Sequence, residues 1–266
     1  MERRTPTGTA YAFVRPEDVT AVTVEDGIAE GLELAIYAGR DQGAIHLESA
    51  VATLAPAGTI GGHIHPFEES FYVLSGRGLI AIGDTTYELR AGDFGFAPLA
   101  YPHAWSNPFD EPLTWLRTRS PQPRPIGTNH GTYRYADLAP PLSGRGIDVE
   151  SVNQRFVGHF DDSQVPPPGP LSMPGYHGYN IRNVSVRMMV DELLGAQHHT
   201  LFIVEFVPST VKGMSAKEHF HPFEETYYFT AGAAEGLIGG EAVSVTAGDL
   251  VFAGVNTSHG YTNEGD

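Results

Sequence analysis

Histidines and acidic residues in a short repeated pattern are the part of this sequence best suited to chemistry. The pattern His-x-His-Pro-Phe-Glu-Glu occurs at 63–69 and returns at 219–225. The spacing between the copies continues downstream without a shift, so that His103 corresponds to His259. Three histidines and a carboxylate in each copy are typical ligands of a transition metal. The candidate ligands are His63, His65, Glu69 and His103 in the first copy and His219, His221, Glu225 and His259 in the second.

A strand on either side of a turn would bring these ligands together. Residues i and i+2 of a strand share a face, so His63 and His65 are expected to project together into a barrel interior. Pro66 cannot donate to a ladder and marks the turn to the next strand, which Glu69 opens. His103 is expected on a later strand across the barrel.

The ligand types indicate a catalytic metal. Neutral imidazoles and one carboxylate favour a divalent first-row ion such as iron, manganese, cobalt, nickel, copper or zinc over calcium or magnesium. Iron, manganese, nickel or zinc is expected, with up to one ion in each copy. Four protein ligands around an octahedral ion leave two positions for water, substrate or dioxygen, which a catalytic metal requires.

Other residues near the motifs have two interpretations. Glu68 and Glu224 fall on the opposite strand face from the ligands, where exposure to solvent is expected and a supporting role at the metal is the alternative. Several apolar residues are expected on the same strand face as the candidate ligands, where they could line a pocket or fill a core equally well. They are Phe71, Val73, Tyr101, Trp105, Tyr227, Phe229 and Tyr261.

Composition narrows the class of protein. The chain has 266 residues, 41% of them apolar, with 31 glycines and 20 prolines, which suits short strands and tight turns better than long helices. It contains no cysteine, and its net charge of −16 disfavours nucleic acid as a partner. There is no apolar run long enough to span a bilayer and no apolar segment after the first residues that would form a signal peptide. A soluble cytoplasmic protein with a small-molecule substrate and no membrane partner is expected.

The repeat predicts two all-β units. Seven or more short strands punctuated by glycine and proline indicate an antiparallel sandwich or barrel in the first copy. The expected divisions are a first barrel at 1–120, a proline-rich linker at 121–175 that could contribute strands, and a second barrel at 176–266. The first copy has a further predicted strand at Leu113–Arg117, but the sequence stops soon after Asn263. One hypothesis is that a strand from the linker or the N-terminal segment completes the second barrel, and the alternative is a longer natural chain.

The spacing of the motif residues resembles the two motifs of the cupin superfamily, and each motif is present twice. The matching segments are His63-x-His65-x3-Glu69-x6-Gly76 with Gly92-x5-Pro98-x4-His103-x3-Asn107, and His219-x-His221-x3-Glu225-x6-Gly232 with Gly248-x10-His259-x3-Asn263. The resemblance implies a bicupin: two tandem double-stranded β-helix (jelly-roll) barrels, each with a three-histidine, one-glutamate metal site. The sequence departs from the family pattern at loop positions, none of them a ligand. These are Gly58, Ala100, Gly254 and Asn256.

The resemblance also implies classes of function. Cupins with this ligand set include dioxygenases, decarboxylases, isomerases, hydrolases and lyases. The first expectation is an oxidoreductase of the quercetinase-like, dioxygenase type acting on a small aromatic or enolisable substrate, with Glu69 or Glu225 also able to act as a base. The alternatives are a redox-neutral isomerase, lyase or hydrolase, and a non-enzymatic small-molecule-binding cupin. The two sites are expected to have unequal roles, and a homodimer is possible. The substrate, the metal and the active member of the pair stay open.

Overall fold

The structure is a computed structural model that describes residues 10–124, 131–148, 156–167, 172–173, 176–177, 184–207 and 216–263. Within these ranges the regular structure is nearly all β, which confirms the expected fold class. The helices described are three single 3₁₀ turns: η1 (Pro16–Asp18), η2 (Arg40–Gln42) and η3 (Asp162–Gln164). In the described part of the chain no helix has the length and apolar character needed to cross a bilayer.

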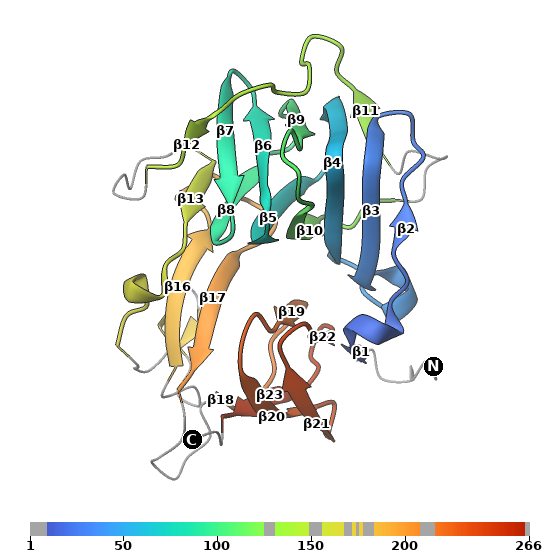
Figure 1. Cartoon of the computed structure of the whole chain (residues 1–266). Helices are drawn as coiled ribbons and strands as arrows, with labels where there is room; N and C mark the ends of the chain where they lie inside the picture. The colour runs from blue at the N-terminus through green and yellow to red at the C-terminus, as the bar shows by residue number, and fades with distance from the viewer. Residues whose placement is uncertain are drawn as a thin grey trace.

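The first barrel is one curled sheet, drawn in blue to green in the upper part of Figure 1. Its strands are β3 (Ala29–Ala38), β4 (Glu48–Ile64), β5 (Glu68–Ser75), β6 (Arg77–Ile82), β7 (Thr85–Arg90), β8 (Asp93–Ala97), β9 (His103–Ser106) and β10 (Leu113–Ser120). They lie in the order β7-β6-β9-β4-β10-β5-β8, and β3 also pairs with β4. The long strand β4 therefore contacts β3, β9 and β10; it carries the candidate ligand His63, and His65 follows its last residue.

The second barrel repeats this arrangement with strands of equal or shorter length. They are β16 (Val184–Val190), β17 (Leu201–Phe206), β18 (Ala216–His219), β19 (Glu225–Tyr228), β20 (Ala233–Ile238), β21 (Glu241–Thr246), β22 (Leu250–Ala253) and β23 (His259–Thr262). The order β21-β20-β23-β18 corresponds to β7-β6-β9-β4, and the β19–β22 pair corresponds to β5–β8. The predicted repeat is thus a repeat of structure.

Short strands outside the barrels attach the connecting segments. They include β2 (Val22–Thr23) on β3, β11 (Tyr133–Arg134) on β4, β12 (Arg145–Gly146) parallel to β7, and β14 (Ser172–Met173) paired with β15 (Tyr176–His177). The expected boundary between residues 175 and 176 falls where the structure describes few residues, so the proposed divisions stay predictions.

Aromatic side chains fill much of the interior of the first barrel. Trp105 and Trp115 stack with ring centroids 4.6 Å apart, and Phe71 meets Trp105 edge-on at 5.0 Å. All three are fully buried. Truncating one of them to alanine would cost about 3–5 kcal/mol, because the barrel could not close around the cavity left behind. The second barrel has a smaller core around Phe229 and Tyr261.

The barrels exchange strands. β1 (Tyr11–Val14), which precedes the first barrel, pairs with β22 of the second. β13 (Val157–His159), which precedes the second barrel, pairs with β8 of the first, and η1 and η3 follow the two exchanged strands in turn. The N-terminal segment thus supplies a strand to the second barrel, as one part of the hypothesis required. The other part, that this strand completes the barrel in place of Leu113–Arg117, is not borne out.

The position of β1 was not predicted. In the first barrel β10 lies between β4 and β5. β1 lies instead on the far side of β22 from β19, which is where β13 lies on β8. β1 therefore does not replace the strand Leu113–Arg117, and among the described residues no counterpart of β10 pairs with β19.

Glu68 connects the barrels, and the expectation of solvent exposure is wrong for it. Its side chain is buried, and its carboxylate accepts backbone N–H groups of Gln197 at 2.8 Å and His198 at 2.9 Å. His199 Nδ1 lies 3.2 Å from the same carboxylate. The outer face of β5 meets the segment before β17 rather than solvent, which explains the difference.

Glu224 makes the reciprocal connection. Its carboxylate accepts the backbone N–H groups of Ile45, His46 and Leu47 at 2.7, 2.8 and 3.1 Å. These residues immediately precede β4, as residues 197–198 precede β17. Each barrel thus binds the other through a glutamate, Glu68 or Glu224, that directly precedes a candidate ligand, Glu69 or Glu225.

Candidate metal centres

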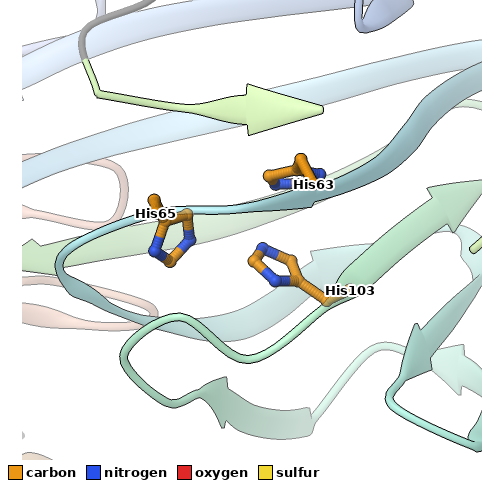
Figure 2. Close-up of side chains that lie close together, drawn as sticks. All are labelled: His63, His65 and His103. Carbon is orange, nitrogen blue, oxygen red and sulfur yellow. The ribbon is translucent and has the colours of Figure 1, made fainter. Parts of the chain in front are cut away.

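The first three histidines converge from two strands. His63 lies at the end of β4 and His65 directly after it, His103 opens β9, and His63 pairs with His103 in the ladder. Figure 2 shows the three side chains gathered in one space, and their ligand atoms all lie within 4.8 Å of one another. The predicted convergence of His63, His65 and His103 is therefore observed.

Backbone carbonyls fix the imidazole orientation in this triad. The hydrogen bonds are His63 Nδ1 to Gly61 O (2.8 Å), His65 Nδ1 to Phe67 O (2.6 Å) and His103 Nδ1 to Tyr101 O (3.0 Å). A proton on Nδ1 leaves the lone pair on Nε2, as in metal-ligating histidines. The Nε2 atoms of His65 and His103 are buried and have no hydrogen-bond partner among the described residues. Buried polar atoms left in this state fit a metal ion as the missing partner.

Burial keeps these imidazoles neutral. It lowers the pKa of His63 to about 3 and that of His65 to about 2, with His103 adding to both effects. Burial lowers the pKa of His103 as well. The triad is therefore in the ligating, deprotonated state well below neutral pH.

Glu69 lies beside the triad and is engaged by an arginine. Its carboxylate accepts a 2.6 Å hydrogen bond from Arg119 Nε and lies 3.9 Å from His65 Nε2. Burial would raise the pKa of Glu69, but the charges of Arg119 and then Arg117 lower it well below its ordinary value. The carboxylate is ionised and faces the predicted site, and ligation by Glu69 stays a prediction.

The second triad has the same construction. His219 ends β18 and pairs with His259 of β23, and the ligand atoms of His219, His221 and His259 lie within 4.8 Å of one another. Their Nδ1 atoms also meet backbone carbonyls, at Lys217 O (2.8 Å), Phe223 O (2.9 Å) and Thr257 O (2.9 Å).

The carboxylate of the second centre differs in its partners. Glu225 lies 2.8 Å from His221 Nε2 and 3.2 Å from His259 Nε2, so it occupies the space between the imidazoles. Burial would raise the pKa of Glu225, but the hydrogen bonds from His221 and His259 lower it to about 2. Burial would lower the pKa of His259, but its hydrogen bond to Glu225 raises it above the ordinary value.

Two departures from the family pattern lie in matching loops. Ala100 and Asn256 both adopt left-handed backbone conformations, with φ of 54° and 61°. Their N–H groups donate to the carbonyls of His65 and His221 at 2.9 Å each. The loop before the third histidine is therefore attached to the second histidine in both barrels, although neither position is glycine.

A cavity of about 1170 Å³ reaches the first centre at His63 and Glu69. Its lining includes Trp115, Arg117 and Arg119 of β10, none of them predicted as site residues. Their alternation with Thr114, Leu116 and Thr118 was the available signal, because alternate residues of a strand share a face. The seven apolar residues that could have lined a pocket are absent from this lining, and Phe71, Val73 and Trp105 belong to the core.

Comparisons with known proteins agree with this architecture. The family model described as "Cupin domain" matches residues 50–118 and 207–266. Among curated proteins no sequence matches the chain.

Solved structures resemble the whole chain at low sequence identity, so these likenesses concern the fold. An oxalate decarboxylase from Lactobacillus farciminis, in a formate complex, is 17% identical with a TM-score of 0.64, covering 100% of this chain and 85% of its own. A putative glyoxylate-induced protein from Pseudomonas aeruginosa is 16% identical with a TM-score of 0.63, covering 100% and 87%. Protein Ylba from E. coli is 15% identical with a TM-score of 0.60, covering 98% and 90%.

Each family match includes one of the histidine triads, and each triad lies in its own jelly-roll barrel. The chain belongs to the cupin superfamily and is a bicupin.

Proposed function

We propose that the chain is a metal-dependent enzyme whose first centre catalyses a redox-neutral reaction, an isomerisation or lyase step that begins with removal of a proton from a carbon next to a carbonyl group. The observation that carries this proposal is the ion pair of Glu69 and Arg119 beside the histidine triad, at the cavity surface. It provides a carboxylate and a fixed cation next to three histidines with ligating geometry.

The residues divide the work as follows. The Nε2 atoms of His63, His65 and His103 would hold the ion. A divalent ion in this place supplies a Lewis acid, which polarises a substrate oxygen and makes neighbouring protons more acidic. Glu69 would accept such a proton, and its low pKa keeps the carboxylate in the unprotonated form that a base requires. Arg119 keeps the carboxylate turned toward the site.

Proton exchange tests this proposal without knowledge of the natural substrate. The protein is loaded with zinc under argon, and loss of the α-protons of a panel of 2-oxo acids and ketones is followed by NMR in D₂O. Glu69→Gln is expected to slow exchange by about 10²–10⁴-fold, the usual contribution of a general base. Glu225→Gln is the matched control and should retain most of the rate. Exchange that requires dioxygen, or that is unchanged in Glu69→Gln, would contradict the proposal.

The second candidate is the dioxygenase-type oxidoreductase expected from the sequence. It is supported by a triad of three neutral imidazoles, which leaves coordination positions free for both a substrate and dioxygen. Oxygen uptake by iron-, manganese- or nickel-loaded protein with flavonols, catechols and diketones is the test. Uptake that stops in His65→Ala would support this candidate, and its absence across the panel would contradict it.

A further inference from the structure

We propose that Arg117 and Arg119 form an anion subsite that binds the carboxylate of a substrate whose apolar part lies along β3 and Trp115. This inference rests on the proposed function of the first centre, since it names the class of substrate. It adds a binding role for two arginines that lie outside the ligand motifs.

The ladder places both guanidinium groups on the cavity side of β10. Arg119 lies between Glu48 of β4 and Glu69 of β5, and Arg117 lies one step further along the same face, between Ala50 and Phe71. Both arginines line the cavity, as do Glu48 and Glu69.

Charge balance favours an anion. Two arginines and two glutamates cancel one another in this cluster, with Arg117 Nη2 and Arg119 Nη1 at 3.4 and 3.9 Å from Glu48 Oε1. A divalent ion in the neighbouring triad would add two positive charges to a buried region. Uncompensated charge is costly in a low-dielectric site, so an anionic ligand is the natural complement. Burial lowers the pKa of Arg117 only to about 10, so it stays charged at neutral pH.

The arginines have donors to spare. A guanidinium carries five N–H donors, and paired donors match the two oxygens of a carboxylate. Among the described residues, Arg117 donates one hydrogen bond through Nη2 to Glu48, at a long 3.4 Å, and Arg119 donates one through Nε to Glu69. The remaining N–H groups can bind a ligand without breaking either ion pair.

The rest of the lining selects an organic anion over an inorganic one. Leu32, Leu34 and Ile60 line the cavity together with Trp115. Burying apolar area of a ligand against these side chains is favourable, so a carboxylate with an aryl or alkyl body gains affinity that phosphate or acetate cannot. The geometry fits a small organic acid with its carboxylate at the arginines.

Calorimetric titration of zinc-loaded protein tests the subsite, with phenylacetate as the probe and phenylacetamide, acetate and inorganic phosphate as comparisons. Phenylacetate is expected to bind at least tenfold more tightly than phenylacetamide. The double variant Glu48→Gln/Arg117→Gln removes one charge of each sign, so that no buried charge is left unpaired, and should lose at least tenfold in phenylacetate affinity. Arg77→Gln, which removes a surface arginine paired with Glu88, is the matched control and should bind as the parent does.

Several outcomes would overturn the inference. They are equal affinity for phenylacetate and phenylacetamide, stronger binding of phosphate than of phenylacetate, and unchanged affinity in the double variant. Should that variant fail to fold, Arg117→Lys decides, because it keeps the charge and loses the paired donors, and a loss of several-fold is expected. Metal content and proton exchange are measured on the same samples. Binding without exchange would contradict the proposed function alone, and exchange without selective binding would contradict the subsite alone.

Discussion

The two candidate metal centres have equivalent histidine triads, but their glutamates have different hydrogen-bond partners. In both, the histidines lie at or near strand ends, and hydrogen bonds from Nδ1 to backbone carbonyls orient the three imidazoles toward one another. Glu69 is bound to Arg119, whereas Glu225 lies between His221 and His259. The first triad is fully buried, whereas His219 in the second is partly exposed.

One strand accounts for this difference. Arg119 belongs to β10, which lies between β4 and β5 in the first barrel. Among the described residues the second barrel has no strand in the corresponding position. The strands that build the triad thus fix the ligands, and a neighbouring strand decides how the carboxylate is used. The two centres are therefore expected to differ in reactivity more than in metal binding.

Removing one histidine from each centre gives the largest expected contrast. His65→Ala and His221→Ala should each remove one equivalent of metal from a fully loaded chain. The rate of proton exchange should fall by on the order of 10²-fold or more in His65→Ala, because the Lewis acid and the base act together. In His221→Ala the rate should fall only a few-fold. Elemental analysis and NMR exchange rates on both variants measure this. Equal losses would mean that the centres have equal roles.

The two reciprocal glutamates at the barrel interface, Glu68 and Glu224, should contribute differently to the free energy of unfolding. Glu68 is buried and accepts two backbone N–H groups, so Glu68→Gln should cost about 3 kcal/mol, since hydrogen bonds to charged groups contribute about 1.5–3 kcal/mol each. Glu224 is only partly buried, and Glu224→Gln should cost about 1–2 kcal/mol. Urea unfolding of both variants measures the costs, with Glu30→Gln on the exposed surface as the control. A larger cost at Glu224 would contradict this ranking.

Acid should release metal from the second centre first. The pKa of His259 is raised, so as the pH falls its protonation competes with metal at a higher pH than protonation of His63 or His65, whose pKa values are about 3 and about 2. In mildly acidic buffer metal affinity should therefore be weaker than at neutral pH in the second centre and nearly unchanged in the first, since protonation of a ligand competes with the metal. Metal retained after dialysis by His65→Ala and by His221→Ala, each with one intact centre, distinguishes the two. Parallel loss would show that this order is wrong.

The left-handed loop residues should give the smallest effect. Ala100→Gly should raise the free energy of unfolding by about 1 kcal/mol, because alanine is strained at positive φ and this side chain is exposed. Asn256→Gly should change it by less than about 0.5 kcal/mol, since asparagine tolerates this conformation. Thermal unfolding of the two variants compares them. A lower free energy of unfolding in Ala100→Gly than in the parent would show that Ala100 is not strained.

The triads could be predicted from sequence because they depend on local rules. His63 and His65 share a face by strand parity, and the repeat assigned His103 and His259 without knowledge of the sheet order. The environment of Glu68 could not be predicted in the same way, since parity tells which face a residue occupies and not what covers that face. Arg117 and Arg119 lay beyond the motifs, and their part in the site depends on the pairing of β10 with β5.

The exchanged strands also affect the order of events during synthesis. The edge of β8 is covered only when residues 157–159 have emerged, and β1 has no partner until β22, near the end of the sequence, has been made. The first barrel therefore cannot be completed before residue 159 has emerged, and the second not before β22 has been made. Native closure is late and depends on contacts between distant residues, which form slowly. The nascent chain would expose unpaired strand edges for most of its translation, and chaperones that shield such edges are expected to matter more for this protein than for two barrels folding in turn.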